Sequence, residues 1–409
     1  MTRWSRDPAR VILTVAAGAV LAAAGAVAQT TDDAAPPSDT VPLVGWGSKG
    51  FELRSRDGNF LIQIQPRVQI RYAYPRDQDP VTLEDFTGDP QHVFKVNRAR
   101  LKIGGHAYRP WLSYFFEYEL AASNLLDFRV MVERFAGLKL KVGQWKVHYN
   151  RERVISSGQQ QLADRSLINR AFTLDRQQGL SLYGRLRGGG AADLSYWASV
   201  FTGMGRGARE NDDKNLMWMG RLQWNVFGRV LPFTGSDIAR RAKPEALIAL
   251  AGVTNRSRYT RFSQDGGGQL TGFPDGQPGQ YRVRQWVAET AFMYRGFAWQ
   301  QEFHWKRIDD QVNTTTTTLI GNYAQVGYFL HEAVSDIPPQ LELAVRHAFY
   351  NPNTALPDDL QQELSLAVNW FFRGHLNKLT AEASLFAFGE DVTDREDGWR
   401  FRLQWDISM

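Results

Sequence analysis

Basic side chains recur at every second position in several segments of the sequence. Arg98, Arg100 and Lys102 form the clearest such row. In an extended strand, residues two apart lie on one face and are separated by about 6.6 Å. An anion could therefore pass along three such cations from one to the next. The same row could instead balance nearby acids such as Glu117 and Glu119 in a salt-bridged wall, and the sequence leaves both interpretations open.

Other basic residues share this spacing or lie in one long polar interval, at about residues 148–178. Further pairs on a common face are Arg67 with Arg71, Lys139 with Lys141, Arg185 with Arg187, and Arg400 with Arg402. Guanidinium groups match the geometry of tetrahedral oxyanions. The predicted pore-lining and anion-binding residues are Arg67, Arg71, Arg98, Arg100, Lys102, Lys139, Lys141 and Arg185. The polar interval offers a rival location for the same function, with Arg151, Arg153, Arg165, Arg170 and Arg176.

Strands with one apolar and one polar face are the elements that would position these cations. In such a strand the side chains alternate between the two faces. Clear alternation occurs in segments 61–72, 98–103, 112–120, 128–133, 138–142, 180–187, 218–225, 297–306, 341–349, 363–370 and 399–409. Weaker alternation occurs in segments 194–201, 246–253, 284–294, 322–330 and 379–388. Together they predict roughly sixteen strands, most of them near the ten or so residues that a tilted strand needs to cross a bilayer.

The character of the two faces favours an all-β transmembrane antiparallel barrel over a soluble β-sandwich or propeller. The apolar faces carry Trp and Tyr at strand ends, whereas the polar faces carry Arg, Lys and Glu at mid-strand, as a water-filled lumen allows. No blade-length repeat is visible. Aromatic residues make up 12% of the chain, which suits aromatic girdles at the membrane interfaces. Closure would place the first and last strands side by side, so Arg67, Arg71, Arg400 and Arg402 should share one region of wall.

The N-terminus has the layout of a secretory signal peptide. Three arginines precede an uncharged, Ala-rich run at residues 11–28 that ends in Ala26-Val27-Ala28. This predicts a signal peptide over 1–28 and a mature chain that begins near Gln29. A single membrane anchor is the alternative, but no basic stop-transfer flank follows the run. We expect a periplasmic N-terminal lead at 29–58 and the barrel at 59–409.

Composition narrows the class of protein. Apolar residues make up 43% of the chain, and there is no second segment long enough to be a membrane helix. The absence of cysteine excludes a disulfide scaffold and a thiol nucleophile. The net charge of +5 falls to about +3 once residues 1–28 are removed. Charge selectivity must therefore come from where the charges lie.

Signals for enzymatic chemistry are weak. The seven histidines include no pair at metal-ligand spacing, and the sequence has no Gly-x-Ser-x-Gly motif. Gly188-Gly189-Gly190 joins two strands and is a turn rather than a phosphate-binding loop. We expect no cofactor, no metal and no nucleic-acid partner, and an outer-membrane barrel enzyme, a lipase or protease with its site at the rim, remains an alternative.

Three segments resemble the phosphate-selective porin O and P family of Gram-negative outer membranes. They read FKVNRARLKIGG at 94–105, LKLKVGQWK at 138–146 and NYAQVGY at 322–328. The resemblance implies a sixteen-stranded trimeric porin whose third extracellular loop folds into the lumen as a constriction, here at about 148–178. The sequence departs from the family at Met409, where Phe or Trp is usual, and acidic residues at inward positions are frequent, so the family's lysine-rich lumen is only partly matched.

These observations together predict a passive outer-membrane channel in a Gram-negative bacterium, exported through the periplasm. We expect it to prefer phosphate or related small anions. A general diffusion channel, or one for organic acids or sugars, is the alternative. The expected partners are small anions, outer-membrane lipid, lipopolysaccharide and two further copies of the chain in a homotrimer.

Overall fold

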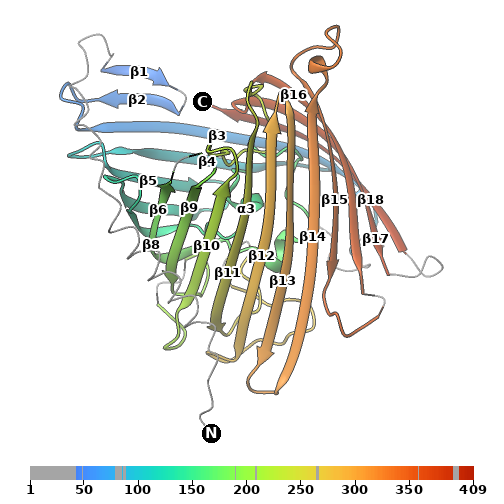
Figure 1. Ribbon diagram of the computed structural model, residues 1–409. Coiled ribbons are helices and arrows are strands. Elements are labelled where there is room, and N and C mark those ends of the chain that lie inside the picture. The colour runs from blue at the N-terminus through green and yellow to red at the C-terminus, as the bar shows by residue number, and fades with distance from the viewer. Residues whose placement is uncertain are drawn as a thin grey trace.

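Sixteen antiparallel strands form a closed barrel (Figure 1). The computed structural model describes residues 43–47, 49–78, 85, 89–188, 190–207, 210–263, 267–357, 359–389 and 396–409. The barrel strands are β3 (Leu61–Tyr74), β4 (Val93–His106), β5 (Leu112–Glu119), β6 (Asn124–Val132), β7 (Lys139–Lys146), β8 (Arg176–Arg187), β9 (Asp193–Phe201), β10 (Met217–Asn225), β11 (Glu245–Ser257), β12 (Tyr281–Tyr294), β13 (Phe297–Asp310), β14 (Thr315–Phe329), β15 (Leu341–Asn351), β16 (Gln361–Arg373), β17 (Asn377–Phe388) and β18 (Glu396–Ser408).

Each strand pairs with its neighbours in sequence, and β18 pairs with β3 to close the barrel. The predicted fold is therefore confirmed, because every segment with clear or weak alternation lies on a strand. The outward residues are apolar and exposed, as in Leu250 and Phe128. No helix in the described part of the chain is long and apolar enough to cross a bilayer. The predicted signal peptide at 1–28 lies outside the described residues.

A short hairpin precedes the barrel and was not predicted from the sequence. Its strands are β1 (Val44–Gly47) and β2 (Gly50–Arg54). Strand β2 pairs with residues 61–64 of β3, whereas β18 pairs with residues 67–74 of the same strand. The hairpin therefore continues the sheet beside the C-terminus (Figure 1).

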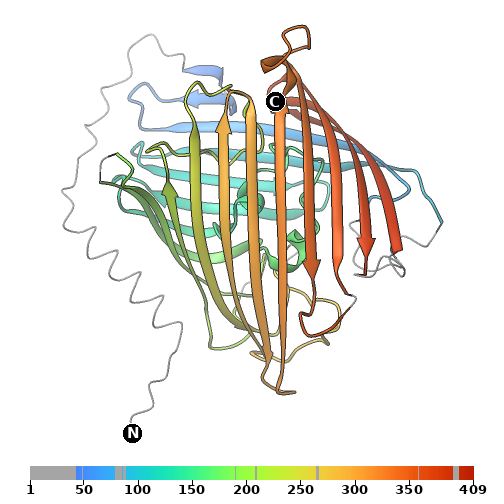
Figure 2. The same cartoon turned by 45° about the vertical axis from the view of Figure 1, so that its right-hand side comes forward.

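Connections at the two ends of the barrel differ, and two of them enter it. We call the end that carries Met409 and the two-residue β12–β13 turn the terminal end, and the opposite end the loop end. The constriction loop, residues 147–175, joins β7 to β8 at the loop end and carries the short helices α3 (Arg151–Val154) and α4 (Asn169–Phe172) inside the barrel (Figure 2). The sequence-based boundary of 148–178 is corrected in one respect: Arg176 is the first residue of β8.

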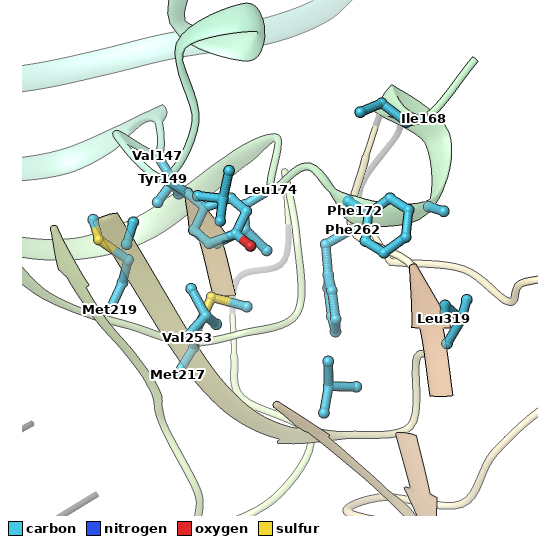
Figure 3. Packing of buried hydrophobic residues seen from close by; sticks show 14 of the residues in the cluster. Val147, Tyr149, Ile168, Phe172, Leu174, Met217, Met219, Val253, Phe262 and Leu319 are labelled. Atoms are coloured by element: carbon cyan, nitrogen blue, oxygen red, sulfur yellow. The ribbon is translucent and has the colours of Figure 1, made fainter. Parts of the chain in front are cut away.

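The constriction loop packs a hydrophobic core against one side of the lumen (Figure 3). Phe172 and Ile168 of the loop are fully buried, as are Met217 of β10 and Leu319 of β14. Burying large apolar side chains stabilises a fold by about 1.5–3 kcal/mol each. The loop is therefore part of the folded core rather than a surface segment.

Candidate functional site

The constriction loop lies within the barrel, where its backbone N–H and C=O groups need partners other than bulk water. Two inward glutamates meet its first turn. Glu289 of β12 accepts a hydrogen bond from the Arg151 N–H at 3.0 Å. Glu302 of β13 accepts from the Glu152 N–H at 2.6 Å and from the Asn150 amide at 2.9 Å. Both glutamates are at most 1% exposed, so the loop backbone takes the place of water around them.

Two more glutamates hold the second half of the loop. Glu382 of β17 accepts from the Ala163 N–H at 2.8 Å, and Glu363 of β16 accepts from the Leu167 N–H at 2.8 Å. Glu363 also forms a 2.5 Å ion pair with Arg346 of β15. The charges of these inward acids are therefore satisfied by the loop and by a neighbouring strand.

Glu342 of β15 joins the constriction loop to a second inserted segment. Its carboxylate accepts from the Gln161 amide at 3.0 Å and from the Ser236 hydroxyl at 2.8 Å. Ser236 belongs to the β10–β11 connection, which enters from the terminal end. In that connection the Gly235 N–H donates to the Gln159 carbonyl at 2.8 Å. The two segments thus brace each other inside the barrel.

Basic and amide side chains of the same strands bind the loop's carbonyl groups. Lys306 of β13 donates to the Ala171 carbonyl at 2.8 Å, and Lys378 of β17 donates to the Gln160 carbonyl at 2.6 Å. Both lysines are at most 1% exposed. We call the inner faces of β12, β13 and β15–β18 the loop-bound wall, because their polar side chains are bonded to the loop.

The inner faces of β4–β9 form a second region, which we call the open wall. Away from its own ends, the loop meets this wall only through long contacts in the described residues. The Arg98 guanidinium lies 3.4 Å from the Asp164 carboxylate, and the Lys146 ammonium lies 3.4 Å from the Ile155 carbonyl. The open wall therefore keeps more of its polar side chains facing the lumen.

The predicted row on β4 divides into three environments. Arg98 faces Asp164 of the loop, whereas Arg100 pairs with Glu117 at 2.9 Å and Glu119 at 2.6 Å on β5. The salt-bridge interpretation thus applies to Arg100 and, through the loop, to Arg98, whereas Lys102 has no carboxylate within ion-pair distance in the described part of the chain.

Arg67 and Arg71 on β3 lie beneath the loop. Arg67 pairs with Asp406 at 2.5 Å, and Arg71 pairs with Asp77 and Asp164, both at 3.0 Å. Each arginine is 2% exposed. Closure does bring β18, with Arg400 and Arg402, beside β3. Acids lie among these arginines, however, since Asp406 pairs with Arg67 and Asp77 pairs with both Arg71 and Arg402, so the region is not a purely basic stripe.

Lys139, Lys141 and Arg185 lie on the open wall near the terminal end. Lys139 pairs with Glu133 at 3.3 Å, and Arg185 pairs with Asp193 at 2.5 Å. Lys141 has no carboxylate within ion-pair distance in the described part of the chain. Its ammonium instead lies 4.7 Å from the centre of the Tyr183 ring.

The five arginines assigned to the loop do not act as one group. Arg151 is fully buried and donates to the Pro232 and Thr234 carbonyls, so it anchors the loop to the β10–β11 connection. Arg170 lies on α4, whose Phe172 ring is 5.7 Å from the Tyr350 ring of β15. Neither residue is near the open wall.

Arg176 belongs to β8 of the open wall, and Arg153 lies beside it because both guanidinium groups contact Asp175. Arg153 pairs with Asp175, and Arg176 pairs with Asp127 at 2.5 Å. Arg165 donates to the Ile155 carbonyl at 2.8 Å. The Asp164 carboxylate accepts from the Arg165 N–H at 3.1 Å and lies 3.4 Å from Arg98, so the loop and the open wall come together around this acid.

Lys146 joins this group and was missed from the sequence. Its ammonium lies within electrostatic range of Arg153, Arg165 and Arg176. By alternation Lys146 is out of phase with inward Lys139, so the pattern gave no signal for it. The described residues contain no group of three acids or histidines placed to hold a metal ion.

A family model for phosphate-selective porins O and P matches residues 66–383. No curated protein is significantly similar to the chain. Solved structures of similar fold include the anion-selective porin from Comamonas acidovorans, with 10% identity, a TM-score of 0.53, and coverage of 85% of this chain and 98% of that one.

Two further structures of similar fold are the outer membrane channel DcaP of Acinetobacter baumannii and a trimer form of OmpT of Vibrio cholerae. DcaP has 9% identity and a TM-score of 0.54, and the match covers 87% of this chain and 99% of that one. OmpT has 9% identity and a TM-score of 0.50, and the match covers 85% and 99%. At these identities the likeness shows the fold alone.

Proposed function

The chain belongs to the phosphate-selective porin O and P family, and on that premise we propose that it is a passive outer-membrane channel that prefers phosphate or related small anions. Family and barrel point to a porin of the Gram-negative outer membrane, and to a channel rather than an enzyme. The preference for anions is the part that needs testing.

The convergence of wall and loop cations at the constriction carries this proposal. Arg98 on β4 and Arg153 and Arg165 on the loop surround one region, while the inward glutamates of the loop-bound wall are covered by the loop. A permeating ion therefore meets these cations together with Asp164, which is shared between Arg71 and Arg98. The name of the family, phosphate-selective porins O and P, and the similar fold of the anion-selective porin from Comamonas acidovorans support this proposal.

The expected selectivity follows from the strength of one such contact. At an effective dielectric constant near 20, a charge about 4 Å from an anion contributes roughly 4 kcal/mol of gross attraction. Desolvation and neighbouring acids offset most of it. A net change of about 1.4 kcal/mol already alters anion occupancy about tenfold.

The test is the reversal potential of single channels in a planar bilayer under a salt gradient, with phosphate added to compete with chloride. We expect anion preference in the unmodified channel. The double variant Arg98→Gln with Arg100→Gln should shift the potential toward cation preference, and so should Arg153→Gln with Arg165→Gln. If only the loop variant changes selectivity, the wall row is structural and the loop is the filter. An unmodified channel without anion preference contradicts the proposal.

The assembly and export of the chain are further parts of the proposal. A homotrimer embedded in lipid and lipopolysaccharide, with its terminal end toward the periplasm, fits the family and the trimer form of OmpT. Unheated gel samples should then run as trimers. Cleavage of residues 1–28 should leave Gln29 or a neighbour as the N-terminus in mass spectra, and retention of Met1 would contradict it.

A further inference from the structure

Two aromatic side chains on the open wall face the lumen without belonging to a core. Phe115 of β5 alternates with outward Tyr114 and Phe116, and Tyr183 of β8 alternates with outward Leu182. Both are half-buried. Neither is part of the hydrophobic cluster under the constriction loop. Packing of that cluster therefore does not explain why aromatic rings stand on a polar wall.

A cation lies over each ring. The Arg129 guanidinium is 4.4 Å from the centre of the Phe115 ring, and the Lys141 ammonium is 4.7 Å from the centre of the Tyr183 ring. Both distances are within the range of about 6 Å for cation–π attraction. One such ring and cation lie on β5 and β6, and the other pair lies on the next two strands, β7 and β8.

Strand pairing makes these groups one continuous patch. Phe115 pairs with Arg129 across β5 and β6, and Met131 pairs with Lys141 across β6 and β7. Tyr183 follows on β8, opposite Lys139. An apolar strip of ring, thioether and ring thus runs beside the cations around the wall.

Glycines on the same inner face leave the wall bare next to the patch. Gly104 pairs with Phe115, and Gly143 pairs with Arg129. Gly143 has a φ of +124°, and an added Cβ would lie 2.1 Å from the Phe128 carbonyl oxygen. This position therefore requires glycine, and no side chain covers the patch from there.

The carboxylates of the described residues do not fully neutralise the cations of the patch. Lys141 is 6% exposed and has no ion-pair partner among the described residues. Asp127, the partner of Arg129, is shared with Arg176, which lies 2.5 Å from it. Glu133 is engaged by the Tyr183 hydroxyl at 2.8 Å and by Lys139 at 3.3 Å. A buried ammonium is costly unless it is paired, so the carboxylate of a solute would stabilise the charged form of Lys141.

We propose that Phe115, Arg129, Lys141 and Tyr183 form a subsite for organic anions, specifically carboxylates attached to a planar aromatic ring. The carboxylate contacts Lys141 or Arg129, and the ring packs on the aromatic side chain beside that cation, Tyr183 or Phe115. An inorganic anion uses only the charges of such a patch, whereas an aromatic carboxylate also uses the rings. The proposal rests on the channel function, since the solute reaches the patch through the lumen.

The test compares how benzoate, acetate and phosphate block chloride current through single channels in a planar bilayer. We expect benzoate to halve the current at a concentration about tenfold lower than acetate, because an aromatic contact is added to the charge contact. Cyclohexanecarboxylate, which lacks a planar π face, should fall between them. Equal blocking by benzoate and acetate in the unmodified channel would overturn the proposal.

The variant Phe115→Leu with Tyr183→Leu keeps apolar volume and removes both rings. In this variant, the concentration of benzoate that halves the current should rise to the value for acetate. The half-blocking concentrations of acetate and phosphate should not change. The matched control, Phe116→Leu with Phe128→Leu, removes outward rings of neighbouring positions and should change none of the three. If the double variant does not fold, Phe115→Leu alone should raise the half-blocking concentration of benzoate about threefold.

The subsite and the proposed anion preference can fail separately. A channel without anion preference in the salt gradient contradicts the proposed function, while the ratio of benzoate to acetate blocking still tests the subsite. An anion-preferring channel in which the double variant keeps the tenfold ratio contradicts the subsite alone.

Discussion

The loop-bound wall and the open wall carry charged side chains with the same inward phase, yet these side chains do different things. On the loop-bound wall, Glu302 and Lys306 are fully buried and bonded to the backbone of the constriction loop. On the open wall, Lys102 and Lys141 have no ion-pair partner in the described part of the chain. An inward charge therefore lines the pore only where the loop leaves it uncovered.

The largest effect should come from removing the acceptors that hold the loop. In Glu302→Leu with Glu363→Leu, the N–H groups of Glu152 and Leu167 lose their acceptors, at about 1–3 kcal/mol each. Arg346 also loses its buried partner, which costs about 3–5 kcal/mol. We expect the loop to leave its position and single-channel conductance to rise.

The matched control for this experiment is Glu133→Leu on the open wall, whose carboxylate is bonded to Lys139 and Tyr183 but not to the loop. Its conductance should stay near that of the unmodified channel. Equal conductance changes in both variants would show that the loop does not depend on the glutamates.

A second, smaller effect sharpens the comparison through stability. On β6, Val130→Arg should destabilise the barrel by about 2–4 kcal/mol if the position lies at the bilayer midplane, whereas Met131→Arg should be tolerated because it faces the lumen. On β11, both Leu250→Arg and Ala251→Arg should destabilise, the latter by about 3–5 kcal/mol, since Ala251 is buried against the loop core. Refolding at a series of urea concentrations measures the free energy of unfolding of all four variants. Tolerance of Ala251→Arg would contradict the packing of β11 against the hydrophobic core of the constriction loop.

The number and order of strands could be predicted because lipid and water impose opposite polarity on the two faces. The strand β11 shows why some segments gave weak signals. Its inward residues Leu247, Ala249 and Ala251 are as apolar as its outward ones, because they pack against inserted segments. The alternation of apolar and polar residues is therefore weak in strands whose inner face packs against inserted segments rather than facing water. The β1–β2 hairpin was missed since four- and five-residue strands carry too little pattern.

The sequence predicts which cations face inward and where the loop lies. It does not predict which residues these cations contact. The pattern could not tell that Arg71 pairs with Asp164 or that Arg151 is an anchor, because these contacts join residues far apart in the chain. The frequent inward acids looked unfavourable for an anion channel. Glu363 and Glu382 are instead hydrogen-bond acceptors for the loop backbone, which no strand pattern reveals.

The smallest effect concerns pH. Burial and the nearby Glu302 carboxylate raise the pKa of Glu152, on the constriction loop, to about 8. The folded state therefore favours protonated Glu152, and this stabilisation is complete below about pH 4.5 and is lost as the pH rises through 8. Above pH 8 we expect noisier single-channel current, because Glu152 is then ionised beside Glu302 and the constriction loop is less stable. Glu152→Gln should remove this dependence, and identical noise profiles for the variant and the unmodified channel would contradict it.

The central claim, that the open wall sets the anion preference, is tested most directly by two matched lysine pairs. Lys102→Gln with Lys141→Gln neutralises the open wall, and Lys306→Gln with Lys378→Gln neutralises the loop-bound wall while keeping a donor for each loop carbonyl. The measurement is the reversal potential of single channels in a salt gradient. We predict that the first pair moves it toward cation preference and that the second leaves its sign and approximate size unchanged. A larger shift from the second pair would contradict the claim.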